Sequence, residues 1–377
     1  MKKTISMYLV AVFFLSQNIL GQTFGVIGDY GVDKIPQLDV SNLMKSWNPD
    51  LIITVGDNNY QGGDSLTIDK NIGKYFHEYI YPYKGTYGLG GTINRFFPTL
   101  GNHDVRTADG KPYFDYFTLP GNERYYDFVW GDVHFFALNS DTTEIDGDSS
   151  ASVQGQWLKN ALESSISPWK IVYFHESPYT SEEYHRSQPR LQWPFVEWGA
   201  TAVLTGHSHN YERIFVNGLT YMVNGLGGHG KRAFVDIIPE SLVQYNQDYG
   251  AMKVVANNDS IVFMFINRAD SLIDYYSINK NTEDINTKQL KPEIELKNFP
   301  NPFKISTRIS FVSPSTGFAE LKVYNLYGKE ITTLLSENIT FGKYEVQWMA
   351  ENLQSGVYYY CLYFADFVKV VKAVIIN

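Results

Sequence analysis

Residues 51–60, LIITVGDNNY, determine how this chain folds. The apolar run at 51–55 is too short for a comfortable helix and is rich in isoleucine and valine, which predicts a strand buried on both faces of a sheet. Gly56 then lets the backbone turn, and Asp57 places a carboxylate at the carboxyl end of the strand, with the Tyr60 phenol close behind. Open α/β sheets bind their ligands at that edge, so we expect the functional site there.

Four other stretches repeat this order, an apolar strand followed at once by a side chain that can bind a metal. They are FGVIGD at 24–29, FPTLGNHD at 97–104, IVYFH at 171–175 and VLTGHSH at 203–209. One glycine-aspartate pair is usually a turn, and a lone histidine is usually hydrogen-bonded rather than a ligand. Five such strand ends together predict one shared site.

The first residues are predicted to be a secretory signal peptide, spanning residues 1–21. Two lysines follow Met1, residues 7–15 are mostly apolar, and Gly21 is a small residue at a plausible cleavage point. The alternative is a membrane anchor, which needs about 20 apolar residues and is disfavoured by the polar residues 16–18. No later stretch is long and apolar enough to cross a bilayer, so we expect no transmembrane span.

Length and charge restrict the class of protein further. The 377 residues exceed one ordinary core and indicate two domains. The formal net charge of -9, without a basic stripe, argues against a nucleic-acid partner. Cys361 is the only cysteine, which excludes an intramolecular disulfide.

Strand-like and helix-like runs alternate through residues 22–280, which predicts a largely parallel sheet covered by helices. Apolar residues recur on one helical face at 40–47, 72–80 and 157–162. The stretches 125–139 and 252–276 instead predict hairpins, which turn at residues 130–132 and 257–259. We therefore expect a second sheet packed on the first, giving a four-layer αββα sandwich.

The composition changes after Tyr276. Residues 281–296 are polar and charged with few apolar anchors, as in a linker. Beyond them no helical period occurs, and short alternating runs at 308–312, 320–324 and 357–363 lie between turn residues. This pattern predicts a small all-β, immunoglobulin-like sandwich over residues 297–377.

Seven side chains at or near the strand ends offer oxygen or nitrogen donors and no thiolate: Asp29, Asp57, Tyr60, Asn102, His175, His207 and His209. Hard oxygen donors together with imidazole suit Fe, Mn or Zn. Because seven ligands are too many for one ordinary catalytic ion, we expect two ions that share a carboxylate. Such a pair activates water and clamps a phosphoryl oxygen.

Five blocks of the sequence resemble, in order and spacing, those of the purple acid phosphatases, which belong to the calcineurin-like metallophosphoesterases. The blocks are GDYG at 28–31, GDNNY at 56–60, GNHD at 101–104, YFH at 173–175 and GHSH at 206–209. The phenol of Tyr60 separates this subgroup from the wider superfamily. The resemblance covers roughly residues 24–279.

The resemblance implies a ferric ion bound by Asp29, Tyr60 and His209. It also implies divalent Fe, Zn or Mn bound by Asn102, His175 and His207, with Asp57 bridging the two ions. A tyrosinate on ferric iron would give the purple colour of the family. A metal-bound hydroxide would then attack phosphorus in line with the departing oxygen.

His103 follows Asn102 and is predicted to protonate the leaving oxygen, with Asp104 or another carboxylate holding its imidazole in the charged form. The alternative is that His103 only supports the neighbouring ligand. Asn102 and His103 are both expected to contact the substrate.

His185 lies ten residues after His175, where plant members of the family have a substrate-facing histidine. The histidine that precedes it in those proteins is Tyr184 here, which we expect to donate a hydrogen bond to phosphate. His185 itself either contacts substrate and takes part in catalysis or is an ordinary loop residue. His229, between glycines, either approaches the rim of the site or is solvated, as loop histidines usually are, and Arg213 is expected to form a supporting ion pair.

The C-terminal segment resembles the sorting domain of type IX secretion. The motifs that carry this resemblance are FPNPF at 299–303, VYNLYG at 323–328, GKY at 342–344, LQSGVY at 353–358 and KVVK at 369–372. Such domains route a periplasmic cargo across the outer membrane and are commonly cleaved there. The alternative is an accessory sandwich that binds a glycan or supports the enzyme.

These features predict a secreted binuclear-metal acid phosphatase that acts on small phosphate monoesters. One alternative is a phosphodiesterase or nucleotidase on the same scaffold, with substrate choice set by rim loops at 61–69, 83–94 and 141–152. The other is a surface-binding protein that has kept the fold but lost turnover. It predicts a missing ligand or acid, and none of the expected positions is vacant.

Overall fold

The computed structural model describes residues 21–280, 296–313, 317–327, 329–340, 342–351, 353–364 and 367–376. Two predicted segments lie largely outside these residues: the signal peptide, of which only Gly21 is described, and the linker 281–296, of which only Leu296 is. Leu296 is buried and pairs with Phe311. It therefore belongs to a strand of the C-terminal region and not to a linker.

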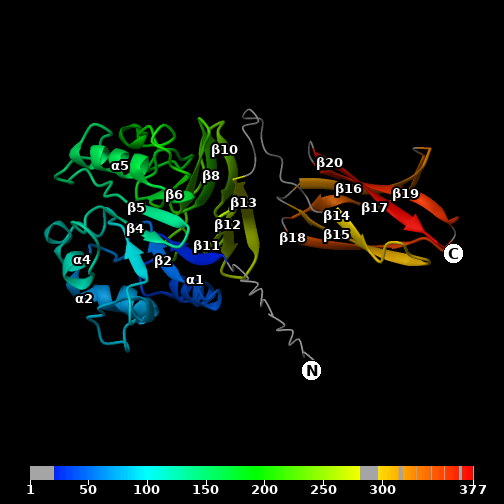
Figure 1. Ribbon diagram of the computed structural model, residues 1–377. Coiled ribbons are helices and arrows are strands. Elements are labelled where there is room, and N and C mark those ends of the chain that lie inside the picture. The colour runs from blue at the N-terminus through cyan, green and yellow to red at the C-terminus, as the bar shows by residue number, and fades with distance from the viewer. Residues whose placement is uncertain are drawn as a thin grey trace, which may run out of the picture.

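Thirteen strands lie in the described part of the chain up to residue 280. They are β1 (Gln22–Ile27), β2 (Leu51–Thr54), β3 (Phe96–Pro98), β4 (Tyr126–Trp130), β5 (Val133–Ala137), β6 (Trp169–Tyr173), β7 (Ala202–Thr205), β8 (Tyr211–Val216), β9 (Leu219–Asn224), β10 (Ser241–Tyr245), β11 (Gly250–Ala256), β12 (Ser260–Asn267) and β13 (Leu272–Asn279). They form a six-stranded sheet of order β13-β12-β11-β1-β2-β3 and a seven-stranded sheet of order β10-β8-β9-β7-β6-β5-β4 (Figure 1).

Both sheets contain a block of parallel strands, as predicted, at one side of the six-stranded sheet and in the middle of the seven-stranded one. Strands β1, β2 and β3 are parallel neighbours, and so are β5, β6, β7 and β9. The two predicted hairpins are also confirmed, since β4 pairs with β5 and β11 with β12 in antiparallel register. Because parallel strands end at the same edge of their sheet, the segments after these strands lie next to one another.

The helices are α1 (Ile35–Ser46), α2 (Ser65–Ile68), η1 (Asp69–Gly73), α3 (Lys74–Phe76), η2 (His77–Tyr79), η3 (Ala108–Gly110), α4 (Lys111–Tyr116), α5 (Val153–Ser164) and η4 (Pro189–Leu191). α1 and α5 confirm two of the predicted helical faces. The third, at 72–80, is a series of short segments that includes a π-helical turn. The prediction of one regular helix there was therefore wrong. The apolar side chains Ile72, Phe76 and Ile80 are nevertheless buried.

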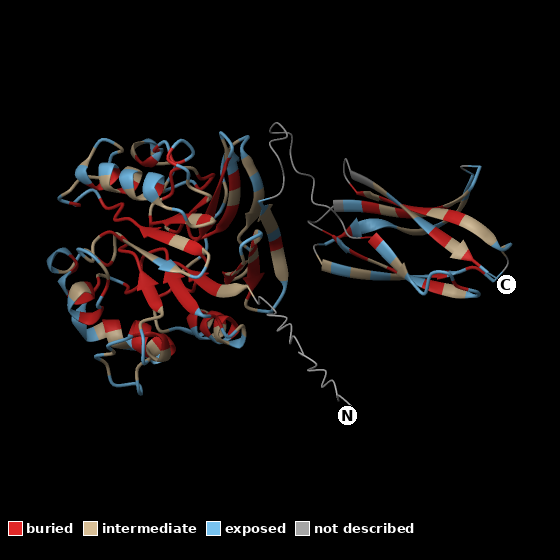
Figure 2. Ribbon diagram, viewed as in Figure 1, coloured by how far each residue is buried: buried red, intermediate tan, exposed pale blue. Residues whose placement is uncertain are grey.

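The core has two layers, because residues along the central strands alternate between the two faces of a sheet. In β6, Ile171 and Tyr173 pack in the core between the two sheets, whereas Val172 and Phe174 pack with Leu158 of α5 on the opposite face. Figure 2 shows the buried residues concentrated along these strands. With α1 to α4 outside the six-stranded sheet, the four-layer αββα sandwich is confirmed (Figure 1).

The C-terminal region consists of strands in its described residues. They are β14 (Leu296–Phe299), β15 (Ser306–Ser313), β16 (Gly317–Asn325), β17 (Glu330–Ile339), β18 (Gly342–Met349), β19 (Gly356–Phe364) and β20 (Phe367–Ile375). Two antiparallel sheets, β14-β15-β18 and β17-β16-β19-β20, enclose a core around Trp348 and Tyr360. The predicted all-β fold of this region is therefore confirmed.

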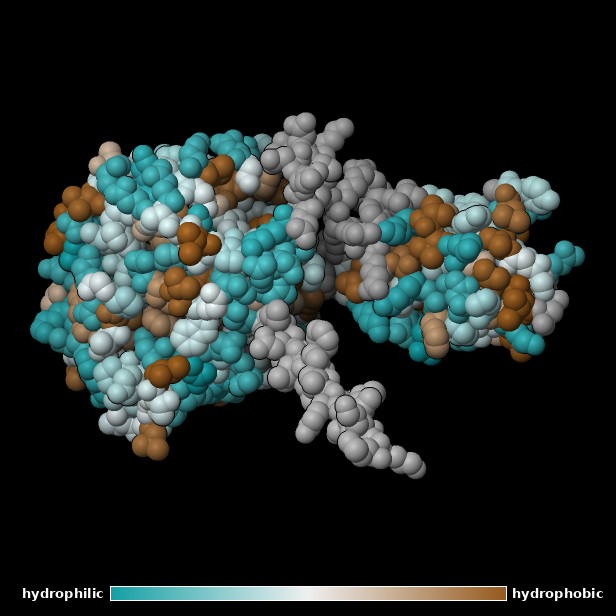
Figure 3. Space-filling model, in the orientation of Figure 1, coloured by the Kyte–Doolittle hydropathy of each residue, from teal (hydrophilic) through white to brown (hydrophobic). Residues whose placement is uncertain are grey.

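Hydrophobic and hydrophilic residues are mixed over the face of the C-terminal region in Figure 3. Some apolar side chains there are strongly exposed, among them Phe299 (82%) and Tyr327 (94%). In the part of the chain that the structure describes, no helix has the length and apolar character needed to cross a membrane.

Candidate metal centre

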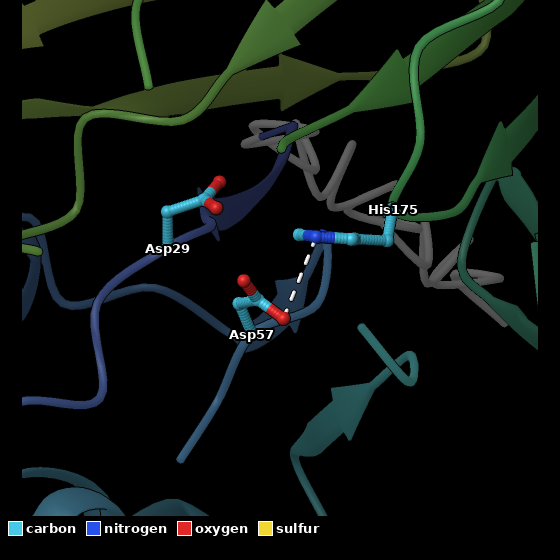
Figure 4. Close-up of side chains that lie close together, drawn as sticks. All are labelled: Asp29, Asp57 and His175. Atoms are coloured by element: carbon cyan, nitrogen blue, oxygen red, sulfur yellow. Dashed lines mark ion pairs between the residues drawn. The ribbon is translucent and has the colours of Figure 1, made fainter. Parts of the chain in front are cut away.

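The five strand ends converge at one edge of the two sheets. Asp29 follows β1, Asp57 and Tyr60 follow β2, and Asn102 follows β3, while His175, His207 and His209 follow β6 and β7. Figure 4 shows Asp29, Asp57 and His175 pointing toward one another, and their donor atoms lie within 4.8 Å. Side chains from both sheets therefore share one buried site.

One group of three donors comes from Asp29, Tyr60 and His209. The Tyr60 hydroxyl is 3.1 Å from Asp29 Oδ1 and 3.3 Å from His209 Nε2, and the last two atoms are 3.2 Å apart. Ligand atoms about 2.0–2.2 Å from one ion stand roughly 3 Å apart when they are neighbours around it. The triangle thus has the size that a single cation requires.

A second group comes from Asn102, His175 and His207. His175 Nε2 lies 3.2 Å from Asn102 Oδ1 and 3.0 Å from His207 Nδ1. The other ring nitrogen of His175 lies 2.8 Å from the carbonyl oxygen of Val55. That carbonyl fixes the orientation of the ring and turns Nε2 toward the site.

Asp57 joins the two groups. Its Oδ2 accepts a hydrogen bond of 2.7 Å from the Tyr60 hydroxyl, while its Oδ1 lies 3.4 Å from His175 Nε2. One carboxylate therefore turns one oxygen to each group. This is the arrangement that a carboxylate shared between two cations would have.

Within the site, the Asp57 carboxylate and the His175 imidazole shift each other's pKa. Burial would raise the pKa of Asp57, but the charge of His175 holds it well below its usual range. Burial would lower the pKa of His175, but the Asp57 carboxylate raises it to about 10. Two buried carboxylates, a phenol, an amide and three imidazoles form a donor set that fits a pair of hard or borderline cations.

The backbone at the site is strained. Asp29, Asp57, His207 and His209 all have φ between 47° and 67°, a left-handed region that residues with a Cβ rarely adopt. Such conformations persist only where the surrounding structure imposes them, and they cluster at functional sites. Four of the seven predicted ligands are therefore held in conformations that the local sequence alone does not favour.

Two glycines allow the ligand segments to approach. A Cβ at Gly56 would lie 2.5 Å from Nδ1 of the His175 ring, and Gly56 itself has φ of 86°. A Cβ at Gly101 would lie 2.3 Å from the backbone nitrogen and from Oδ1 of Asp57. Only glycine lets β2, β3 and β6 bring their ends this close together.

His103 lies at the rim, half-buried, with its backbone N–H donating to Asp57 Oδ1 at 2.9 Å. Its Nδ1 lies 2.6 Å from the Gln61 carbonyl oxygen, and its Nε2 lies 3.9 Å from Asp57 Oδ2. Burial lowers the pKa of His103, an effect that the Asp57 charge opposes.

Of the two predicted alternatives, the carboxylate near the His103 imidazole is another one, that of Asp57, 3.9 Å from Nε2, and Asp104 has a different role. Its buried carboxylate accepts hydrogen bonds from the backbone N–H groups of Asn58, Asn59 and Gly101 and from the Asn58 side chain. The Gln61 carbonyl takes the place at His103 that was expected for Asp104. Asp104 instead ties the segment after β2 to the segment after β3.

The structure places His185 at the site and leaves Tyr184 largely exposed. The His185 ring lies 3.8 Å from the His207 ring, and its Nδ1 lies 3.2 Å from Glu182 Oε2. Burial lowers the pKa of His185, while the Glu182 charge opposes that shift. Tyr184 is 74% exposed, and its ring packs against the guanidinium of Arg232.

His229 lies at the site, so of its two predicted alternatives the approach to the rim is the one that the structure supports. Its ring stacks on the Tyr60 ring at 3.8 Å, with 13° between the ring planes, and lies 5.0 Å from the His209 ring. The loop that carries His229 follows β9, which runs parallel to β7. A sequence feature could have located His229 at the site: a sixth strand, LTYMVN at 219–224, is followed by glycines and then by this histidine.

Arg213 forms the expected ion pair, with its Nε 2.7 Å from Asp274 Oδ2. Asp274 also accepts a hydrogen bond from the buried Tyr211 hydroxyl. The pair links β8 to β13 and so joins the two sheets. It supports the segment after His209 without touching the donor groups.

Comparison with known proteins agrees with this geometry. The sequence profile of the calcineurin-like phosphoesterases matches residues 23–211. A purple acid phosphatase of Glycine max is 26% identical over 230 residues, which cover 54% of this chain and 47% of that protein. A nucleotide pyrophosphatase/phosphodiesterase of Hordeum vulgare is 22% identical over 278 residues, which cover 63% of this chain and 74% of that protein. This chain thus spans about half the length of the Glycine max relative.

A solved structure and a second profile complete the comparison. A purple acid phosphatase from yellow lupin (Lupinus luteus) seeds has a TM-score of 0.57 at 17% identity, covering 68% of this chain and 53% of that one, so the two share a fold. The profile of the secretion system C-terminal sorting domain matches residues 297–377. Both resemblances seen in the sequence motifs are confirmed.

Proposed function

The chain belongs to the calcineurin-like phosphoesterase family, and we propose that it is a binuclear-metal acid phosphatase that hydrolyses phosphate monoesters. The observation that carries this proposal is the convergence of seven donor side chains in two groups joined by Asp57. The family uses a binuclear metal centre. A site with every donor present supports an enzyme rather than a binding protein that has lost turnover.

The two donor groups differ in chemistry, which supports different ions. Asp29 offers a carboxylate and Tyr60 a phenol beside His209, and on binding a cation the phenol would become a phenolate, which favours a trivalent ion such as ferric iron. Asn102, His175 and His207 would bind a cation through uncharged donor atoms, which suit divalent Fe, Zn or Mn. Two adjacent cations supply Lewis acidity, which makes a bound water acidic and neutralises charge on a phosphoryl group.

The residues around the donors have separate tasks in this proposal. His103 presents Nε2 at the rim while the Gln61 carbonyl holds Nδ1, so His103 can give a proton to the leaving oxygen. His185 lies against His207 and contacts the phosphoryl group from the opposite side. Tyr184 is exposed beside it and contacts the more distant part of the ester.

The first test is activity with defined metals. The full chain, stripped with a chelator and reconstituted with ferric iron and zinc, is expected to be coloured and to release phosphate from an aryl phosphate. Chelator-treated protein without added metal is the control and is expected to be inactive. A colourless preparation that stays inactive after reconstitution would contradict the proposal.

A phosphodiesterase or nucleotide pyrophosphatase is a second candidate, since the Hordeum vulgare relative has that name and matches over most of its own length. Rates on a monoester and a diester with the same aryl leaving group separate the two functions. A faster rate on the monoester is expected, and a faster rate on the diester would favour the second candidate.

The C-terminal sorting domain indicates secretion through the type IX system to the cell surface or beyond. We propose that residues 1–21 direct the chain to the periplasm first. Phe299 and Tyr327 lie in two of the motifs of the sorting domain and are strongly exposed. Because they contribute little to the core, recognition by the secretion machinery accounts for their presence better than packing does.

Deletion of residues 297–377 is expected to retain the enzyme in the periplasm of the host cell. Phosphatase activity in the medium should fall to background, while the specific activity of the periplasmic protein stays unchanged, because the donor side chains all precede residue 210. Fractionation with an activity assay measures both. The full-length Asp57→Asn variant, followed by antibody, is the control and should still leave the cell. Undiminished export of the truncated protein would rule out the sorting role.

A further inference from the structure

Arg232 lies at the edge of the metal centre, and no hydrogen bond or ion pair of its guanidinium occurs among the described residues. Its backbone N–H donates to the carbonyl oxygen of His209 at 3.0 Å, which fixes its position beside one of the predicted ligands. Its Nε is buried and has no hydrogen-bond partner. A buried donor left unpaired costs free energy, so its retention calls for a functional reason.

The other arginines of the chain differ from Arg232 in this respect. Each of them has a guanidinium nitrogen near a carboxylate or carbonyl oxygen: Arg95, Arg106, Arg124, Arg186, Arg190, Arg213, Arg268 and Arg308. The only guanidinium contact that Arg232 makes in the described part of the chain is with the Tyr184 ring, whose centroid is 5.0 Å from Cζ. Within an acidic chain, this cation is therefore free to bind an added anion.

The contacts of its loop place Arg232 close to the metal centre. The loop that carries it is tied to the loop of His185, since Val235 N donates to Ser181 O at 2.8 Å. The guanidinium of Arg232 lies over the ring of Tyr184, the residue next to His185, whose ring packs against His207. Arg232 and Tyr184 thus lie together next to the segments that carry the donors His207 and His209.

A guanidinium presents a planar fork of N–H groups that matches the oxygens of a phosphate group. Resting on the proposed function, we propose that Arg232, backed by Tyr184, binds a second phosphate group of the substrate. The preferred substrates are then phosphate esters or anhydrides that carry another phosphate next to the one that is hydrolysed. A simple monoester leaves the fork empty and binds more weakly.

The test compares two compounds that cannot be hydrolysed, methylphosphonate and methylenediphosphonate. Calorimetry on the metal-loaded full chain is expected to show tighter binding of the diphosphonate. Arg232→Gln should weaken diphosphonate binding by about 10-fold or more and change monophosphonate binding by less than about twofold. Arg232→Lys keeps the charge but not the fork and should recover part of the affinity.

Arg186→Gln is the matched control, because Arg186 is exposed in the loop that carries Tyr184 and His185, and among the described residues its side chain bonds only the Glu183 carbonyl. It should bind both compounds as the wild type does. Equal weakening of both compounds by Arg232→Gln, or no preference for the diphosphonate in the wild type, would overturn the proposal.

The binding test does not depend on turnover, which separates the two proposals. If the protein hydrolyses an aryl phosphate but its binding is indifferent to Arg232, the second phosphate site is overturned and the phosphatase stands. If Arg232 governs diphosphonate binding in a protein that hydrolyses no phosphate ester, this site is supported and the phosphatase is overturned.

Discussion

Replacing Asp57 with asparagine is expected to lower kcat/KM on an aryl phosphate by at least about 10³-fold, or about 4 kcal/mol. Asp57 turns one oxygen toward Tyr60 and the other toward His175, so both donor groups depend on it. Asparagine keeps the size of the side chain but removes its charge and replaces one oxygen with an NH2 group, which cannot bind a cation. The metal content per chain should fall together with the activity.

The measurement combines kinetics with metal analysis of the same preparation. Asp259→Asn is the control, because Asp259 is an exposed acid in the turn between β11 and β12 and its loss should change neither quantity. An Asp57→Asn protein with unchanged turnover and full metal content would remove the basis of the proposed function.

The strands that build the site could be predicted because each is a short apolar run followed by a polar residue, with a glycine between them in four of the five. The parallel arrangement then places the ends of β1, β2 and β3 at one edge, and those of β6 and β7 at the corresponding edge of the second sheet. The packing of the two sheets brings these edges together. The order of strands and helices along the sequence therefore already predicts that residues as far apart as Asp29 and His209 are neighbours.

The helical segment at 72–80 shows what periodicity cannot tell. The spacing of Ile72, Phe76 and Ile80 places them on one side of the chain, and all three are buried. Burial every fourth residue is satisfied by α-helical, 3₁₀ and π turns alike, since it reports which face is covered and not which backbone groups bond. The sequence therefore predicted the packing of this segment but not its hydrogen bonds.

The partners of Asp104, His229 and Arg232 were not predictable because they depend on contacts between distant segments. The pairing of β9 beside β7, after the chain has passed through β8, places His229 on the Tyr60 ring. Asp104 satisfies backbone N–H groups of a different loop, a role that its position after His103 does not reveal. The sequence motifs were enough to locate the site. The contacts of the residues around it could be known only from the order of the strands in the sheets.

Replacing His103 with asparagine is expected to slow hydrolysis of an alkyl phosphate by about 10²- to 10⁴-fold. The same change should slow hydrolysis of 4-nitrophenyl phosphate far less, because nitrophenolate departs without a proton whereas an alkoxide needs one. The Gln61 carbonyl fixes Nδ1 of the imidazole and leaves Nε2 facing the site. In the proposed function Nε2 is therefore the ring nitrogen that gives the proton to the departing oxygen.

The ratio of the two rates distinguishes a proton donor from a support for Asn102 and Asp57. If His103 only positions the Asp57 carboxylate through its backbone N–H, asparagine preserves that bond and both substrates should react at nearly the wild-type rate. If the ring matters only for packing against Tyr60, both rates should fall by the same factor. His134→Asn is the matched control, since His134 lies on β5, bonded to Asp127 and Ser165, and should leave both rates unchanged. A loss confined to the alkyl ester is therefore the one outcome that assigns proton donation to His103.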